Sequence, residues 1–114
     1  MQFLALIHGN EDRWDSLTGD ERQALYERYV EFSQSDKVVG GAELESTNTA
    51  TTVRLRDGDR LVTDGPYAEV KEALGGFFIL ECDSIDEACR LAAGIPAAEH
   101  GAVEVRPVYV REES

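Results

Sequence analysis

The residues of this 114-residue chain that are best equipped for chemistry lie close together, in one segment between two apolar runs. Its ionisable and hydrogen-bonding side chains are Asp64, Tyr67, Glu69, Lys71 and Glu72. A carboxylate can accept a proton and a phenol can donate one, so the segment predicts cofactor-free acid–base chemistry if the chain is an enzyme. We expect Asp64 or Glu69 to act as the base, and Tyr67 to act as the acid or hydrogen-bond donor. Lys71 would stabilise a developing negative charge, and Glu72 would contribute to ligand binding.

The same residues also have a structural interpretation. Asp64 precedes Gly65-Pro66, where its side chain can accept backbone N–H hydrogen bonds and fix a turn. Glu69, Lys71 and Glu72 are close enough in sequence to form a solvated charged surface. The sequence leaves the structural and the chemical interpretation open.

Three further polar residues lie on predicted strands. Glu104 and Arg106 are two positions apart, so their side chains share one face of a strand. If that face lines a pocket, Arg106 can bind a carboxylate with two hydrogen bonds, with Glu104 as its orienting group or as a base. If the face is solvated, they form a weak surface ion pair. His8 ends the first strand on the face of Leu4 and Leu6, as a structural residue or as a ligand-binding acid or base.

The histidine spacing does not support a metal site. His100 follows Pro96 in a predicted exposed loop, and neither H-x-x-x-H nor H-E-x-x-H occurs. The glycine pairs Gly40-Gly41 and Gly75-Gly76 do not open a helix, as a phosphate-binding loop would. We therefore predict no metal and no cofactor.

The composition excludes several classes of partner. The chain has 11 basic and 23 acidic residues, a formal net charge of −12, and its basic residues are spread singly from Arg13 to Arg111. Nucleic-acid and anionic membrane surfaces are bound through clustered Lys and Arg, so neither is expected here. The length and an apolar content of 42% predict a single domain over residues 1–114.

Cysteine usage and the first apolar run bear on location. Cys82 and Cys89 lack C-x-x-C spacing, so we expect two buried free thiols, which fits a reducing cytoplasm. The apolar run Phe3–Ile7 is five residues long with no basic residue before it, which predicts a strand rather than a signal segment.

The hydrophobic periodicity predicts two β-α-β units with a hairpin between them. Strands are expected at Phe3–Ile7, Val38–Ala42, Thr51–Arg56, Arg60–Thr63, Phe77–Leu80 and Ala102–Val110. Helices are expected from Gly19 to about Asp36 and from Ser84 to about Ile95, each begun by a capping box. Residues His8–Leu17 are expected to form a polar loop, and Tyr26, Tyr29 and Phe32 are expected in the core.

The element order predicts an α+β fold of the ferredoxin-like split β-α-β type, with an inserted hairpin and both helices on one face of an antiparallel sheet. The other face must carry either Phe77 and Ile79 or Phe78 and Leu80. An apolar sheet face needs cover, so we expect a homodimer.

Asp57-Gly58 predicts a tight turn for the hairpin. A three-residue loop would pair Leu55 with Leu61, whereas a two-residue loop would place Leu55 opposite Arg60. We favour the three-residue loop because it keeps one face of the hairpin apolar.

Asp64-Gly65-Pro66-Tyr67, Glu69, Lys71-Glu72 and Leu74-Gly75-Gly76-Phe77 together resemble the signature of the YCII-related family, and more narrowly of its DGPF branch. Gly101-Ala-Val-Glu-Val-Arg-Pro107 and the loop with Trp14 also resemble that family, so the resemblance covers nearly the whole chain. The resemblance implies a bacterial protein that forms a dimeric α+β barrel. The wider superfamily of lyases, isomerases and monooxygenases implies a small polar or anionic organic ligand and, for an enzyme, lyase or isomerase chemistry.

The resemblance also implies an alternative function. Some proteins of the DGPF branch resemble partners of extracytoplasmic-function sigma factors, which would make the chain a non-catalytic regulatory module. Trp14 and the acidic segment Glu11–Asp15 would then form the surface for a protein partner.

Two positions depart from the family pattern. Tyr67 stands where the motif has phenylalanine, and the predicted helix Gly19–Asp36 lacks the histidine that the YCII branch pairs with an acidic residue. That dyad cannot be carried over, and the sequence leaves enzyme and binding protein open.

Overall fold

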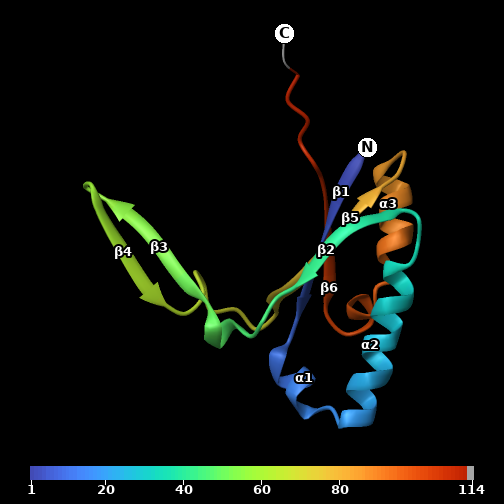
Figure 1. Cartoon of the computed structure of the whole chain (residues 1–114), viewed down its shortest axis with the longest axis horizontal. Helices are drawn as coiled ribbons and strands as arrows, with labels where there is room; N and C mark the ends of the chain where they lie inside the picture. Colours follow the sequence, from blue (N-terminus) through green and yellow to red (C-terminus); the bar gives the residue numbers. More distant parts are fainter. Residues whose placement is uncertain (113–114) are drawn as a thin grey trace.

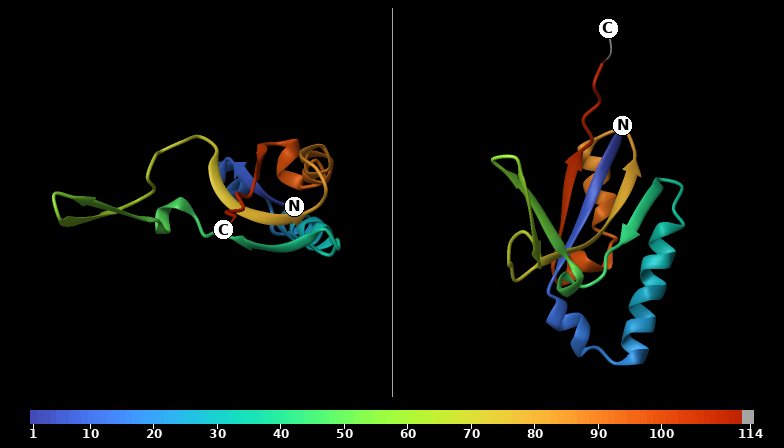
Figure 2. Two further views of the ribbon diagram at one scale, coloured as in Figure 1. Left: turned by 90° about the horizontal axis from the view of Figure 1, so that it is seen from above. Right: turned by 60° about the vertical axis from the view of Figure 1, so that its left-hand side comes forward.

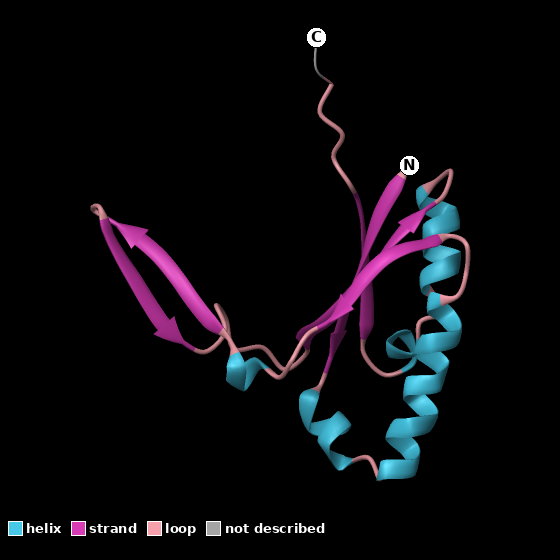
Figure 3. Cartoon of the chain, viewed as in Figure 1, coloured by secondary structure: helices cyan, strands magenta, loops and turns pink. Residues whose placement is uncertain are grey.

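The computed structural model describes residues 1–112 and shows a four-stranded antiparallel sheet with helices packed on one face (Figure 1). The sheet strands, in spatial order, are β2 (Val38–Glu43), β5 (Ala73–Glu81), β1 (Gln2–Gly9) and β6 (Ala102–Pro107). The helices are α1 (Glu11–Ser16), α2 (Gly19–Ser33) and α3 (Ile85–Ala92), with short 3-10 turns η1 (Thr47–Thr49) and η2 (Pro96–Glu99). A second, two-stranded sheet consists of β3 (Thr51–Arg56) and β4 (Asp59–Asp64) (Figure 3). The predicted α+β, ferredoxin-like arrangement is confirmed.

The helices begin where their capping residues predict. Thr18 accepts a hydrogen bond from the Glu21 backbone N–H at 3.1 Å, and the Glu21 carboxylate accepts one from the Thr18 N–H at 3.0 Å. Ser84 caps α3 by accepting from the Glu87 backbone N–H at 3.1 Å. The end of α2 comes earlier than predicted, at Ser33 rather than about Asp36, where the Gln34 N–H closes the last turn.

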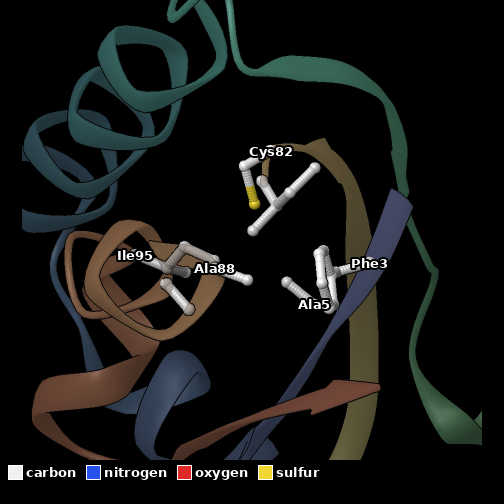
Figure 4. Close-up of a cluster of buried hydrophobic side chains, with 7 residues drawn as sticks. Phe3, Ala5, Cys82, Ala88 and Ile95 are labelled. Carbon is white, nitrogen blue, oxygen red and sulfur yellow. The ribbon is translucent and has the colours of Figure 1, made fainter. Parts of the chain in front are cut away.

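The core lies between the sheet and the helices α2 and α3 (Figure 4). Its fully buried side chains include Phe3 and Leu80 from the sheet and Ile95 from the segment after α3. Phe78 packs against Phe32 of α2, with ring centroids 4.9 Å apart. Since Phe78 and Leu80 face the helices, Phe77 and Ile79 occupy the opposite face of β5.

We call this opposite surface the open face. It carries Leu4 and Leu6 of β1 beside Ile79 and Phe77 of β5, and all four are only partly buried in a single chain. The pairing of β1 with β6 places Arg106 opposite Leu4 and Glu104 opposite Leu6. The open face is therefore apolar in its middle and charged along β6.

The hairpin of β3 and β4 projects from the body as an arm, on the side opposite α2 and α3 (Figures 1 and 2). Its register differs from our prediction: Leu55 pairs with Arg60 and Val53 with Val62. The turn has two residues, Asp57 with φ of 52° and Gly58 with φ of 83°, as a primed turn requires. The prediction was wrong because it assumed that burial selects the register, whereas Leu55 and Leu61 are 66% and 47% exposed.

Other local predictions were also wrong. Residues Glu11–Ser16 form α1 and not a polar loop, because Asn10 caps them by accepting a hydrogen bond from the Asp12 N–H at 2.9 Å. The last strand ends at Pro107 and not at Val110, and one further backbone hydrogen bond, from the Val108 N–H to the Gln2 carbonyl at 2.9 Å, follows it. Tyr26 is exposed, because it points away from the stripe of α2 that meets the core, and Cys89 is exposed on α3, although both thiols are free. Within residues 1–112, no helix is long and apolar enough to cross a membrane.

Candidate functional site

The open face holds a polar pair. His8 Nε2 lies 3.2 Å from Glu104 Oε1, and the two residues come from neighbouring strands. The His8 side chain is 29% exposed and the Glu104 side chain 51%. A carboxylate beside an imidazole orients the ring and fixes which ring nitrogen carries the proton. The pair can therefore donate or accept a proton at the edge of an apolar surface.

The sequence placed His8 and Glu104 separately among the ligand-binding residues, and the antiparallel register brings them together. Glu104 and Arg106 lie on one face as expected, but the hydrogen-bond partner of Glu104 within residues 1–112 is His8. Arg106 lies two residues after Glu104 on β6, and its side chain is exposed. Val108 and Val110, which the predicted strand Ala102–Val110 included, lie beyond the observed strand and are 40% and 76% exposed.

The motif residues form a second group, at the base of the arm. Asp64 ends β4 opposite Thr51, and Tyr67, Glu69, Lys71 and Glu72 follow in the exposed loop before β5. The Tyr67 ring is 80% exposed, with the Arg54 guanidinium 5.4 Å from its centroid. The predicted site residues therefore divide within one chain into a body group, with His8, and an arm group, with Asp64.

A cavity of about 360 Å³ adjoins the end of β1, between α1, α2 and η2. Its apolar wall includes Trp14, Leu17, Leu25 and Tyr29. Burial raises the pKa of the Tyr29 phenol, so this group is a neutral hydrogen-bonding group near pH 7. None of residues 51–72 lines the cavity, whereas His8 does. The cavity and the His8–Glu104 pair therefore adjoin.

Besides His8, three basic residues and the carboxylate residue Glu21 line this cavity. Arg28 forms two hydrogen-bonded contacts with Glu99, at 2.9 and 3.0 Å, which tie α2 to η2. This bonding lowers the pKa of Glu99 and raises the pKa of Arg28. Arg13 also lines the cavity, and its guanidinium makes no ion pair within residues 1–112. His100, predicted to be exposed, is exposed and adds a third basic group.

The walls of the cavity are held by short-range contacts. Arg22 donates to the carbonyl oxygens of Trp14 and Asp15, at 3.3 and 3.1 Å, and its guanidinium lies over the Trp14 ring. On the other side, a Cβ at Gly101 would overlap the His8 carbonyl oxygen, so the segment after η2 needs glycine to cross the end of β1. These contacts hold α1 against α2 and bring the segment after η2 against the end of β1.

A family model for the YCII-related domain matches residues 1–112. This chain belongs to the YCII-related family. It is also similar to an uncharacterised protein of Rhizobium meliloti (strain 1021), with 40% identity over 118 residues that cover 95% of this chain and 92% of that protein. Membership agrees with the fold, whereas assignment to the DGPF branch stays a prediction.

For this YCII-related chain, sequence reasoning missed the residues that line the cavity, including Arg13 and Tyr29. The available signal was Asn10 followed by Glu11 and Asp12, which is a helix start with an acidic first turn. Recognising α1 would have placed Arg13 and Trp14 on a helix facing α2. Among residues 1–112, no group of three or more His, Cys, Asp or Glu is arranged to hold a metal ion.

Proposed function

We propose that this protein binds a small organic anion in the cavity beside His8, with the His8–Glu104 pair as an acid–base group. The observation that supports this most is the combination of a 360 Å³ cavity with an adjoining imidazole–carboxylate pair and with the Arg13 guanidinium, which makes no ion pair within residues 1–112. Ligand pockets typically have volumes of about 300–1,000 Å³, apolar walls and a few placed polar groups. A ligand with one carboxylate and an apolar body matches this lining.

The chemistry follows from the charges. A carboxylate held by Arg13 would place the rest of the ligand against Trp14 and Tyr29, within the cavity that His8 lines. His8 would remove a proton from the ligand, and Glu104 would stabilise the imidazolium that forms. Proton abstraction of this kind is the first step of many isomerisations and eliminations, which is the reaction class that we propose if the bound ligand is converted.

Binding of an organic anion in the cavity is tested by thermal unfolding with benzoate, phenylacetate and succinate as probes. A probe at 100 times its Kd stabilises the folded state by about 2.7 kcal/mol, which raises the Tm by several degrees. We expect Arg13→Ala to remove this shift and Arg13→Lys to keep part of it. Arg56→Ala removes an arginine from the distant arm and serves as the matched control. A shift that survives in Arg13→Ala would refute this site.

The acid–base role is tested in the second stage of the same experiment. A bound probe with an acidic C–H bond, such as phenylpyruvate, should exchange that proton for deuterium in D2O faster with the wild type than with His8→Gln. Glu104→Gln should also slow the exchange while leaving the thermal shift in place. Equal rates of deuterium exchange in the wild type and both variants would show that the protein binds the probe without catalysing proton removal.

The assembly that we propose is a homodimer formed through the open face. Leu4, Leu6, Phe77 and Ile79 form a continuous apolar surface that no element of the same chain covers within residues 1–112. A second copy can cover such a surface symmetrically. Sedimentation equilibrium measures this directly, and a monomer at micromolar concentration would refute it.

The regulatory alternative rests on Trp14 and the segment Glu11–Asp15. Trp14 is 40% exposed, and its ring is already stacked by Arg22 and lines the cavity. These contacts favour a role for Trp14 in the cavity wall. A protein partner, such as a sigma factor, becomes the better proposal if none of the three probes changes the Tm.

A further inference from the structure

The arm has the properties of an element that is completed by another chain. Two-stranded hairpins are marginally stable alone and need a packed face. Val53, Leu55 and Val62 share one face of this hairpin and are 56% to 66% exposed. The radius of gyration is 16.4 Å, compared with about 13 Å for a compact domain of this length. The projecting arm and the extended segment after β6 both contribute to this difference (Figure 2).

Hydrogen bonds nevertheless hold the base of the arm. The Gly65 N–H donates to the Ala50 carbonyl at 2.8 Å, and the Thr52 hydroxyl donates to the Gly65 carbonyl at 2.8 Å. Glu11 of α1 accepts hydrogen bonds from the backbone N–H and the hydroxyl of Thr47, both at 2.8 Å. These contacts fix the direction in which the arm leaves the body, so its apolar face is held away from its own sheet.

The position and charge of the arm select its partner surface. The arm leaves on the side of the open face, opposite α2 and α3, so a chain that covers the open face must meet it (Figures 1 and 2). Thr51–Asp64 contains three arginines and three aspartates and is neutral, whereas the rest of the chain has 8 basic and 20 acidic residues, a net −12. An arm without net charge adds no repulsion of its own when it approaches such a body. The apolar hairpin face and the apolar open face are both present in every copy, as a symmetric pair requires.

We propose that the arm of each subunit lies across the open face of its partner and brings the motif loop 64–72 to the partner's polar pair. Val53, Leu55 and Val62 would pack on the face that contains Leu6 and Phe77. Tyr67, oriented by Arg54, and Asp64 would then border the face on which the other copy carries His8, Glu104 and Arg106. The two groups of site residues, separate within one chain, would form one composite site. This inference rests on the proposed homodimer and is independent of the ligand in the cavity.

The test places a nitroxide on the arm of one copy and observes the other copy. The spin label is attached at position 63 of a Thr63→Cys, Cys89→Ser variant that contains no ¹⁵N. Cys89 is replaced because its thiol is exposed and would also react. Position 63 is chosen because it lies on the face of the hairpin that does not carry Val53. The spin-labelled variant is mixed by co-refolding with ¹⁵N-labelled Cys89→Ser protein. We expect broadening of the amide signals of Leu6, Phe77 and their neighbours on β1 and β5, reversed by ascorbate. The amides of α3, on the far side of the sheet, serve as the internal control and should stay sharp.

A pair of matched variants tests the contact surface. Leu55→Asp should raise the Kd of the dimer at least tenfold, whereas Thr63→Asp adds the same charge on the other hairpin face and should change it less than threefold. A dimer in which broadening is confined to β3 and β4, or to α3, would overturn the composite site and leave the homodimer standing. A monomer by sedimentation would overturn both, while the thermal-shift result on the cavity would remain interpretable.

Discussion

Leu80 of β5 and Leu61 of β4 are the same residue type on antiparallel strands, yet Leu80 has no exposed surface and Leu61 is 47% exposed. Leu80 lies beneath helices that pack on its sheet, and Leu61 belongs to a hairpin with no second layer from its own chain. The body therefore obtains its geometry from burial, whereas the arm obtains it from a turn and a few hydrogen bonds at its base. The following predictions test this difference, beginning with the largest effect.

Truncation of a core leucine should affect the body far more than truncation of an arm leucine. Leu80→Ala should lower the free energy of unfolding by about 2–5 kcal/mol, because it leaves a cavity in a packed core. Leu61→Ala should change it by about 0.5 kcal/mol or less. Urea denaturation of both variants makes the comparison. Equal losses would show that the arm is buried as deeply as the body.

A residue with a side chain at the tip of the hairpin should loosen the arm alone. Gly58 has a φ of 83°, a left-handed conformation that costs a residue with a Cβ about 1–2 kcal/mol. We expect Gly58→Ala to reduce hydrogen-exchange protection in β3 and β4 and to leave β1 and β5 unchanged. Asp57→Asn, which tolerates the φ of 52° at the preceding position, is the control. Loss of protection in β5 as well would contradict independent behaviour of the two regions.

Acid should weaken the contact between Glu11 of α1 and Thr47 at the base of the arm. The pKa of Glu11 is lowered from its ordinary value of 4.5, chiefly by the hydrogen bond from the Thr47 backbone N–H. Since the folded pKa lies below the unfolded one, the contribution of this contact is complete above pH 4.5 and is lost as the pH falls through the folded pKa. The Thr47 amide signal should therefore move on acidification.

The effect at Glu11 should be the smallest of the three, because the carboxylate is partly solvated. In Glu11→Gln, the Thr47 amide should have at pH 7 the chemical shift that the wild type shows only in acid. Asp12→Asn, which changes the neighbouring carboxylate on α1, is the control and should titrate as the wild type does. If the Thr47 amide shift depended on pH in the same way in the wild type and in Glu11→Gln, the Glu11 carboxylate would be excluded as the group that holds Thr47.

Local signals predicted the fold well. The capping residues Thr18 and Ser84 start α2 and α3 because their hydrogen bonds reach only three residues along the chain. The strand around Phe78 was also predictable, since its apolar residues are neighbours in the sequence. The family signature predicted the same arrangement from motifs that span most of the chain.

Contacts between distant residues were less predictable. His8 and Glu104 are 96 positions apart, and only the register of β1 with β6 brings them together. The cavity needs α1, α2 and η2 at once, and α1 had been predicted as a loop. The hairpin register was wrong because the burial that was used to choose it does not exist within one chain.

The two edges of the sheet determine how copies of this chain can add to one another. β2 has an irregular register between Val38 and Gly40, and β6 ends at Pro107, which has no N–H to offer. Both edges are thereby poor templates for continuing the ladder into a neighbouring molecule. Assembly through faces closes after two copies, whereas assembly through edges would continue without limit. The interrupted edges therefore disfavour edge-to-edge pairing of copies in a chain whose arm exposes Val53, Leu55 and Val62.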